Sequence, residues 1–135
     1  MHQDSNNPPP PATEEGTEDQ KPTTNGPKLL DYDIEKILYN FHQIFLYGAI
    51  DEKLTPCICE ELVAMDAMNQ LSFGKEVDKY VPITMRIWSP GGYVSAGLAI
   101  IDTIDSIQTP VVTMVTGQAA SMATIITVVG DMRIA

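Results

Sequence analysis

A run of mostly β-branched residues, Val111–Thr116, is the feature that most constrains the fold of this chain. Such a run is typical of a strand buried on both faces, as in sheets that helices cover on both sides. Strand and helix patterns alternate before and after it, from residue 43 onward. This alternation is the order of right-handed βαβ crossovers. The sequence therefore predicts an α/β fold with a largely parallel sheet.

The other elements are predicted from apolar spacing and from glycine or proline at their ends. We expect a short helix that Asp31 caps and that runs through Tyr39. A helix over Tyr93–Ile107 is expected to bury a stripe made of Val94, Leu98, Ile101 and Ile104. The remaining predictions are strands at 43–47, 81–88 and 132–135, a polar connection at 75–79, and helices at 54–70 and from residue 121 to about 129.

Residues 1–27 differ in composition from the rest of the chain. They hold six of the ten prolines, five acidic residues and one lysine, and their only apolar residues are Met1 and Ala12. Such a segment buries too little surface to offset the entropy lost on ordering. We predict a disordered, acidic, proline-rich tail at 1–27 and one folded domain at 28–135. The tail resembles neither a secretory signal nor a transit peptide.

Charge and cysteine content argue against several classes of protein. The chain has 18 acidic and 8 basic residues, a net charge of -10, and no basic cluster. This disfavours nucleic-acid binding and attachment to an anionic membrane. No apolar run is long enough for a spanning helix. Cys57 and Cys59 point to opposite sides of a helix, so we expect two half-buried thiols rather than a disulfide or zinc site, and a cytoplasmic location.

Two turns are candidate sites of chemistry, because each follows a predicted strand and ligands of α/β sheets collect at the carboxyl ends of strands. In Ser89-Pro90-Gly91-Gly92, the glycines permit positive φ and close approach of a ligand. In Gly117–Met122, Ser121 lies at the start of a helix, where free N–H groups favour an oxyanion. Taken alone, these features are better explained as a tight turn and an N-cap serine.

Neither turn is a Walker A loop, a dinucleotide-binding turn or a Gly-x-Ser-x-Gly elbow. Taken together, they supply a hydroxyl from Ser121 and backbone donors from the first turn and from Met122. A nucleophile beside an oxyanion hole is the arrangement that acyl transfer needs.

The stretches that carry a family resemblance are Ser89-Pro-Gly-Gly92, Ala96-Gly-Leu-Ala-Ile-Ile-Asp-Thr103 and Gly117-Gln-Ala-Ala-Ser-Met122, with Tyr32–Ile34 and Ile44–Asp51 upstream. They resemble the proteolytic subunit of the Clp protease over about residues 30–135. The resemblance implies a crotonase-like spiral of ββα units, with its C-terminal part missing from this chain. It also implies a serine endopeptidase that cleaves unfolded proteins with a Ser-His-Asp triad inside stacked heptameric rings.

By position in this family, Ser121 corresponds to the nucleophile, and Gly91 and Met122 correspond to the oxyanion-hole donors. The stretch after Gly92 corresponds to the segment that pairs with substrate as an added strand. The partners that the resemblance implies are unfolded protein or peptide substrates, further copies in a homo-oligomeric ring, and a AAA+ unfoldase. ATP is used by that unfoldase, and we expect no cofactor for this chain.

No base for the serine is present after Lys79, where the sequence contains neither His nor Lys. His2 lies in the tail, and His42 stands beside the first strand, where we expect a surface or packing role. Asp102 matches a structural helix position of the family, and Trp88 stands where the family usually has a polar residue. We therefore expect this chain to be inactive toward peptides by itself, with the catalytic His and Asp encoded beyond Ala135.

Two other functions stay open. A non-catalytic subunit of a Clp-type ring would explain the missing base, although the intact Ser121 turn disfavours it. A crotonase-type acyl-CoA enzyme would share the oxyanion hole without a serine nucleophile, and Gly117–Met122 argues against it.

Overall fold

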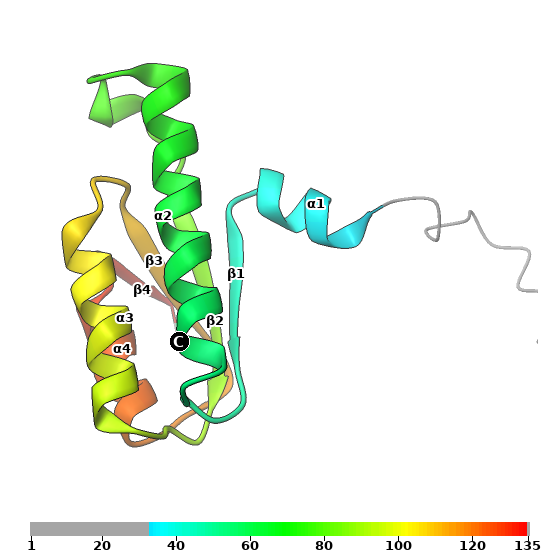
Figure 1. The fold of residues 1–135 in the computed structure, drawn as a ribbon, viewed down its shortest axis with the longest axis vertical. Helices are drawn as coiled ribbons and strands as arrows, with labels where there is room; N and C mark the ends of the chain where they lie inside the picture. The colour runs from blue at the N-terminus through cyan, green and yellow to red at the C-terminus, as the bar shows by residue number, and fades with distance from the viewer. Residues whose placement is uncertain (1–32, 135) are drawn as a thin grey trace, which may run out of the picture. The chain divides into compact units, whose positions relative to one another are not determined.

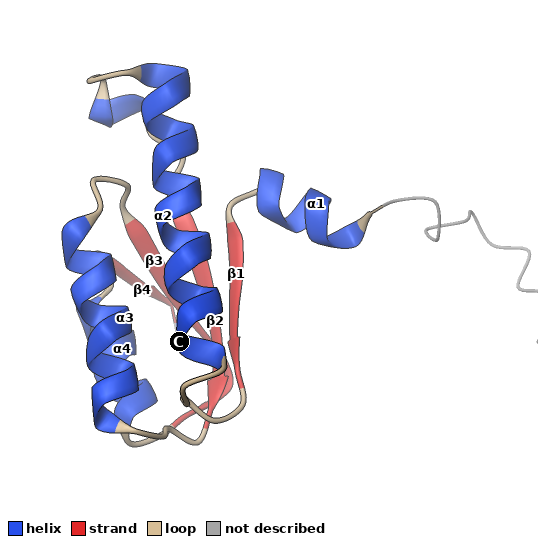
Figure 2. Cartoon of the chain, viewed as in Figure 1, coloured by secondary structure: helices blue, strands red, loops and turns tan. Residues whose placement is uncertain are grey.

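The computed structural model describes residues 33–134, so the predicted tail at 1–27 and the predicted cap Asp31 lie outside the described residues. Its core is a four-stranded sheet of order β1-β2-β3-β4 in which all neighbouring strands are parallel. Figures 1 and 2 show α2 and α3 lying side by side over this sheet. The predicted α/β class and parallel sheet are confirmed.

The structure contains, in chain order, α1 (Ile34–Asn40), β1 (Gln43–Tyr47), α2 (Leu54–Phe73), a 3-10 turn η2 (Val77–Lys79), β2 (Ile83–Ser89), α3 (Val94–Ser106), β3 (Val111–Ala119), α4 (Met122–Val129) and β4 (Met132–Ile134). The β3 strand is longer than predicted and includes Gly117. The extension follows a register shift after Ile87, beyond which Ser89 pairs with Ala119.

Aspartates at helix starts fix where the first two helices begin. Asp33 caps α1, accepting a hydrogen bond of 3.3 Å from the Lys36 N–H. Asp51 accepts bonds of 2.8 and 2.9 Å from the N–H groups of Leu54 and Lys53 before α2. These two bonds lower the pKa of the Asp51 carboxyl below its usual value.

The hydrophobic core lies between the helices and one face of the sheet. Alternation along β1 and β2 buries one set of side chains and leaves Tyr47 and Trp88 exposed on the other face. The prediction that Val111–Thr116 is buried on both faces is therefore wrong for the described chain, since Val112 and Met114 are only half-buried. The fully buried apolar side chains of the core include Ile44, Leu46, Ile50, Leu62, Ile83, Met85, Ile87, Ile100, Val111 and Ile126.

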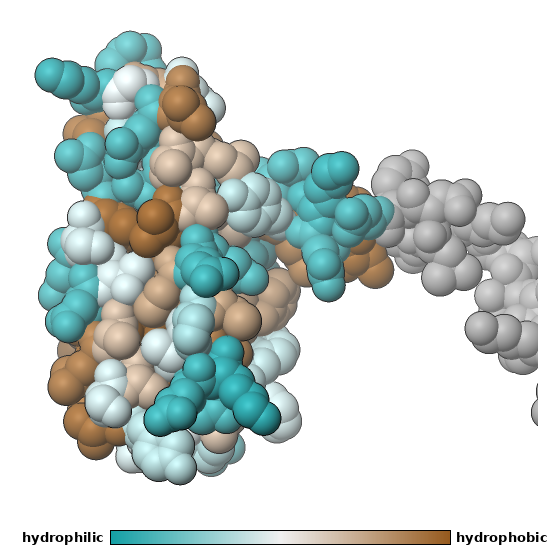
Figure 3. All heavy atoms as spheres, in the orientation of Figure 1, coloured by the Kyte–Doolittle hydropathy of each residue, from teal (hydrophilic) through white to brown (hydrophobic). Residues whose placement is uncertain are grey.

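The buried face of α3 agrees with the predicted stripe only in part: Ile104 is buried and Ile101 half-buried, but Val94 and Leu98 are not. Its buried residues are Ala96, Gly97, Ile100 and Ile104, whereas Val94 and Leu98 are 65% and 47% exposed. Apolar residues lie on both faces of this helix, and the small residues turn inward because they let neighbouring elements approach its backbone. On the α2 side, Thr55 reaches the Ala96 carbonyl at 3.4 Å. Figure 3 shows hydrophobic side chains on the surface over the lower part of the helix layer.

A buried polar network ties α2 to two loops. The Asp66 carboxylate accepts bonds from the N–H and hydroxyl of Thr109, at 2.8 and 2.6 Å. The Asn69 amide binds both the N–H and the carbonyl of Val81, at 3.0 and 2.9 Å. These contacts hold the loops before β2 and β3, so they fix where both strands begin.

Candidate active site

The two turns predicted to carry chemistry lie against each other. Because β2 and β3 are parallel neighbours, their carboxyl ends reach the same edge of the sheet. The Ala120 N–H donates a bond of 3.1 Å to the carbonyl of Ser89. Gly91 has a φ of 96°, and a Cβ there would lie 2.7 Å from the Ala120 oxygen and 2.8 Å from the Ser121 Cβ. Only glycine allows this approach, so the first turn packs directly on the serine turn.

Ser121 has an unusual backbone conformation between β3 and α4. Its φ is 52°, a value that costs a non-glycine residue about 1–3 kcal/mol, and its side chain is exposed. It occupies the N-cap position of α4, yet its side chain makes no capping hydrogen bond. The explanation of Ser121 as an N-cap serine requires such a bond, so the structure does not support it. Strain at an exposed hydroxyl is the kind of outlier that active sites retain.

The Met122 N–H is a free donor beside this hydroxyl. Met122 is the first residue of α4, where N–H groups have no partner within the helix. The next two N–H groups bind the carbonyls of Ala120 and Ser121, at 3.1 and 3.0 Å, but no acceptor for the Met122 N–H occurs among the described residues. Its nitrogen lies 3.1 Å from where a Gly91 Cβ would stand, so the donor atom lies against the first turn.

The two glycines of the first turn use their N–H groups differently. The Gly91 N–H donates to the buried Ser89 Oγ at 3.1 Å. The Gly91 carbonyl accepts a bond of 3.0 Å from the Ile50 N–H, so in the trans peptide the Gly92 N–H points away from Ile50. Gly92 is exposed, and within residues 33–134 its N–H has no acceptor. The doubled glycine predicted backbone donors in this turn, and the family resemblance assigned the role to Gly91; among the described residues it is the Gly92 N–H that has no acceptor.

No described side chain beside Ser121 can serve as its base. His42 is 4% exposed, and its Nδ1 lies 3.0 Å from the carbonyl of Val81. It precedes β1 and so lies at the amino edge of the sheet, the length of a strand away from the serine turn. Of the two predicted roles, the structure confirms packing. Asp102 is exposed on α3, and the chain from residue 80 to residue 134 contains no His or Lys.

Aromatic side chains border the site on the open face of the sheet. The Trp88 and Tyr47 rings meet edge to face at 6.1 Å between centroids. Gly117 has a φ of 112°, and a Cβ there would lie 3.2 Å from Trp88 Cδ1. Trp88 therefore covers the backbone of the second turn, a few residues before Ser121.

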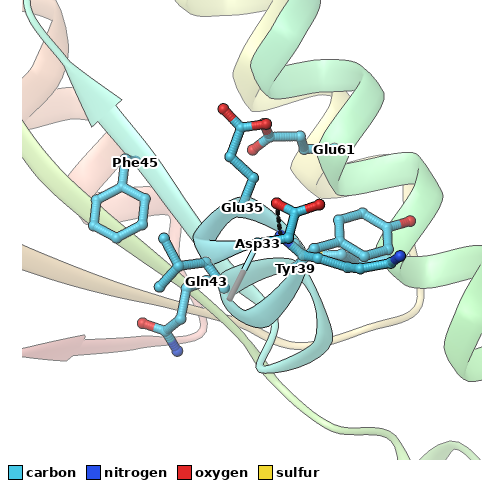
Figure 4. Close-up of a pocket in the computed structure, with 9 residues that line it drawn as sticks. Asp33, Glu35, Tyr39, Gln43, Phe45 and Glu61 are labelled. Carbon is cyan, nitrogen blue, oxygen red and sulfur yellow. Dashed lines mark hydrogen bonds between the residues drawn. The ribbon is translucent and has the colours of Figure 1, made fainter. Parts of the chain in front are cut away.

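A separate hollow of about 560 Å³ lies between α1, β1 and α2. Figure 4 shows the Glu35 side chain beside that of Glu61 at this hollow. Burial, and secondarily the charge of Glu35, raise the pKa of Glu61 above its usual value. Gln43, at the start of β1, also lines this hollow, so it lies at the opposite sheet edge from Ser121 and is not part of the site.

The cysteines add no chemistry to the site. Cys57 is exposed and Cys59 is half-buried, and both are free thiols, so the expectation of two half-buried thiols is correct only for Cys59. Within the described range, no cluster of three or more His, Cys, Asp or Glu side chains is arranged to hold a metal. None of the helices described is both long and apolar enough to cross a bilayer.

Comparisons with known proteins identify the family and the fold. The family model described as Clp protease matches residues 27–135. Among solved structures, a point mutant of ClpP1 from Listeria monocytogenes superposes with a TM-score of 0.61 at 28% sequence identity. The match covers 72% of this chain and 51% of that protein, so the chain spans about half the length of the bacterial subunit.

Proposed function

The chain belongs to the Clp protease family, and from this we propose that it provides the nucleophile and the oxyanion-binding turns of a serine endopeptidase subunit. Ser121 is the proposed nucleophile. The N–H groups of Met122 and of the Gly91–Gly92 turn are the proposed oxyanion donors. The proposed substrates are peptide bonds of unfolded proteins.

The observation that carries this proposal is the strained and exposed Ser121 beside the Met122 N–H, which has no acceptor among the described residues. In the proposed reaction, Ser121 Oγ bonds to the carbonyl carbon of the substrate and its proton leaves to a base. The C–N bond then breaks as that proton passes to the leaving amine, and water releases the acyl group from the serine. N–H donors that are fixed in place before the reaction stabilise the negative charge of the tetrahedral intermediate by hydrogen bonding. Each such donor contributes about 100- to 1,000-fold in rate.

Within the first turn, two donors remain candidates. The family resemblance assigns this role to Gly91, and that assignment stays a proposal. In the present conformation its N–H is bonded to Ser89 Oγ, whereas the Gly92 N–H is exposed and has no acceptor among the described residues. The geometry therefore favours Gly92 as the partner of Met122.

The part of the mechanism without a candidate among the described residues is the base, because residues 80–134 contain neither His nor Lys. A free serine hydroxyl is a weak nucleophile without one. We propose that turnover needs a histidine and an aspartate from outside this sequence, and that the chain by itself does not hydrolyse peptides. A homo-oligomeric ring, a AAA+ unfoldase that uses the ATP, the absence of a cofactor and a cytoplasmic location are further parts of the proposal that follow from the family.

A non-catalytic ring subunit is the second candidate function. It is favoured by one observation, the absence of His and Lys between residues 80 and 135. In that case the Ser121 turn would serve only to join β3 to α4.

Covalent labelling separates the two candidates. The purified 135-residue chain is treated with a fluorophosphonate probe, with and without imidazole as an external base, and the labelled residue is mapped by mass spectrometry. We expect imidazole-dependent labelling at Ser121 that Ser121→Ala removes and that Ser95→Ala, a change at an exposed serine on α3, leaves intact. If the folded Ser121→Ala variant is labelled to the same extent as the original chain, the nucleophile assignment is refuted and the non-catalytic subunit is favoured.

A further inference from the structure

Gly97 occupies a place where its own backbone does not require glycine. It lies inside α3 with an ordinary negative φ, and its N–H makes the regular helical bond to the Tyr93 carbonyl at 3.0 Å. Glycine inside a helix is less favourable than alanine. A buried glycine at such a place therefore indicates a close contact from outside the helix.

That contact is the side chain of Met122. A Cβ on Gly97 would lie 2.7 Å from Met122 Cε and 2.9 Å from its Sδ, and closer still to its Cγ. Met122 is 3% exposed, so its thioether is enclosed in the hollow that the missing Cβ leaves on α3. Any side chain at Gly97 would displace it.

Met122 is thus held between two glycines from different elements. Its side chain rests on Gly97 of α3, and its backbone nitrogen lies 3.1 Å from the Cβ position of Gly91. The residue directly before it is Ser121, whose strained φ of 52° persists only where neighbouring contacts hold it. The Met122 side chain is the anchor nearest to that strained position along the chain.

We infer that Gly97 is a positioning residue, because it forms the seat that fixes the Met122 N–H and the Ser121 hydroxyl relative to the first turn. The inference rests on the proposed function for its catalytic meaning, since Gly97 touches no substrate and acts only through Met122. The contact between Gly97 and Met122, which sets the start of α4, is measured separately from any catalytic effect.

The test compares four ¹⁵N-labelled variants of the full chain with the original: Gly97→Ala, Met122→Ala, the double variant, and Gly130→Ala as control. Gly130 is a matched control because it is also buried with a negative φ, and a Cβ there would lie 2.6 Å from Thr113 rather than near Met122. We record amide spectra, urea unfolding, and the rate of fluorophosphonate labelling of the folded protein in imidazole. In that labelling, an Oγ–P bond forms, fluoride leaves, and imidazole takes the serine proton.

We expect Gly97→Ala to shift the amide signals of Gly91, Met122 and Ala123 and to slow labelling by about 10- to 100-fold, as small misplacements of reacting groups do. Gly130→Ala should lower stability without either effect. The double variant should lose less free energy of unfolding than the two single variants lose together, because alanine at position 122 relieves the clash. Additive stabilities, or unchanged amide signals in Gly97→Ala, would overturn the inference.

Two further outcomes keep the inference separate from the proposed function. If the original chain is not labelled at Ser121, the nucleophile proposal fails, and the amide shifts and the double-variant comparison still decide whether Gly97 seats Met122. If Gly97→Ala does not fold, nuclear Overhauser contacts between the Gly97 Hα protons and the Met122 methyl group in the original chain decide the same question. Their absence would refute the seat.

Discussion

Ser89 and Gly91 are joined by a hydrogen bond of 3.1 Å from the glycine N–H to the serine Oγ, and both residues are buried. The carbonyl of the same serine accepts the N–H of Ala120, one residue before Ser121. Ser89 therefore holds the first turn through its side chain and the second turn through its main chain.

Replacing Ser89 with alanine is expected to lower the free energy of unfolding by about 1–3 kcal/mol. The change leaves the Gly91 N–H buried without its acceptor, and a buried unsatisfied donor costs about that much. Urea unfolding of Ser89→Ala, compared with Ser106→Ala, measures the effect, since the Ser106 hydroxyl binds a carbonyl at the exposed end of α3. Equal losses in the two variants would show that the Ser89 hydroxyl is unimportant for the turn.

Gly91→Ala is expected to destabilise the fold more than Gly48→Ala does. Both glycines have positive φ, of 96° and 88°, but a Cβ at Gly48 meets nothing within 4 Å, whereas one at Gly91 meets Ala120 and Ser121. The φ penalty, about 1–2 kcal/mol, is common to both changes. The difference between their unfolding free energies therefore reports the packing of the two turns, and a difference near zero would contradict that packing.

Removing the Asp66 carboxylate is expected to cost about 2–4 kcal/mol of stability. Asp66→Ala leaves the N–H groups of Gln108 and Thr109 and the Thr109 hydroxyl without their shared acceptor in a buried setting. Asp102→Ala, on the exposed side of α3, is the control and should change the free energy of unfolding by less than about 0.5 kcal/mol. Thermal or urea unfolding that gave both variants the same stability would rule out an anchoring role for Asp66.

Glu61→Gln is expected to change how stability depends on pH. Burial and Glu35 raise the pKa of Glu61 from the usual 4.5, so the folded state holds this proton more tightly than the unfolded state. The stabilisation from this tighter proton binding is fully present below the pKa that Glu61 has in the unfolded state, and it is lost as pH rises through the pKa of the folded state. At neutral pH the charged Glu61 therefore lowers the free energy of unfolding. Glu61→Gln should then be the more stable protein at pH 7, by under about 1 kcal/mol because the hollow removes this carboxylate from water only in part, and the gain should vanish at pH 3.

The comparison that checks this prediction is chemical unfolding of both proteins at the two pH values. A gain that is equal at pH 3 and pH 7 would assign the effect to packing of the amide rather than to the charge.

Much of the fold could be predicted from local patterns. The bounds of β1 match the prediction, because a short β-prone run ending in Gly48 leaves few alternatives. The starts of helices were harder to place. Asp31 and Asp33 are equally good caps in sequence, and the described structure shows Asp33 in that role. For α3, both faces are apolar, so periodicity alone could not show that Ala96 and Gly97 turn inward.

The candidate site was predictable in its residues but not in its hydrogen bonds. Ser121 and Met122 follow from a hydroxyl at the start of a helix after a strand, a local pattern. The hydrogen bond from the Gly91 N–H depends on where the Ser89 hydroxyl lies. The contact between Gly97 and the Met122 side chain depends on α3 packing against α4. Contacts of this kind join residues distant in sequence, so no local pattern contains them.

The strand order β1-β2-β3-β4 has a consequence for how the two turns depend on each other. Each strand pairs with the one before it in the chain, so the sheet extends in a single direction from its N-terminal strand. The turn after β2 carries the carbonyl and the glycine on which the later serine turn packs. The strained conformation of Ser121 therefore depends on β3 lying beside β2, and a change that loosens this pair of strands should relax it.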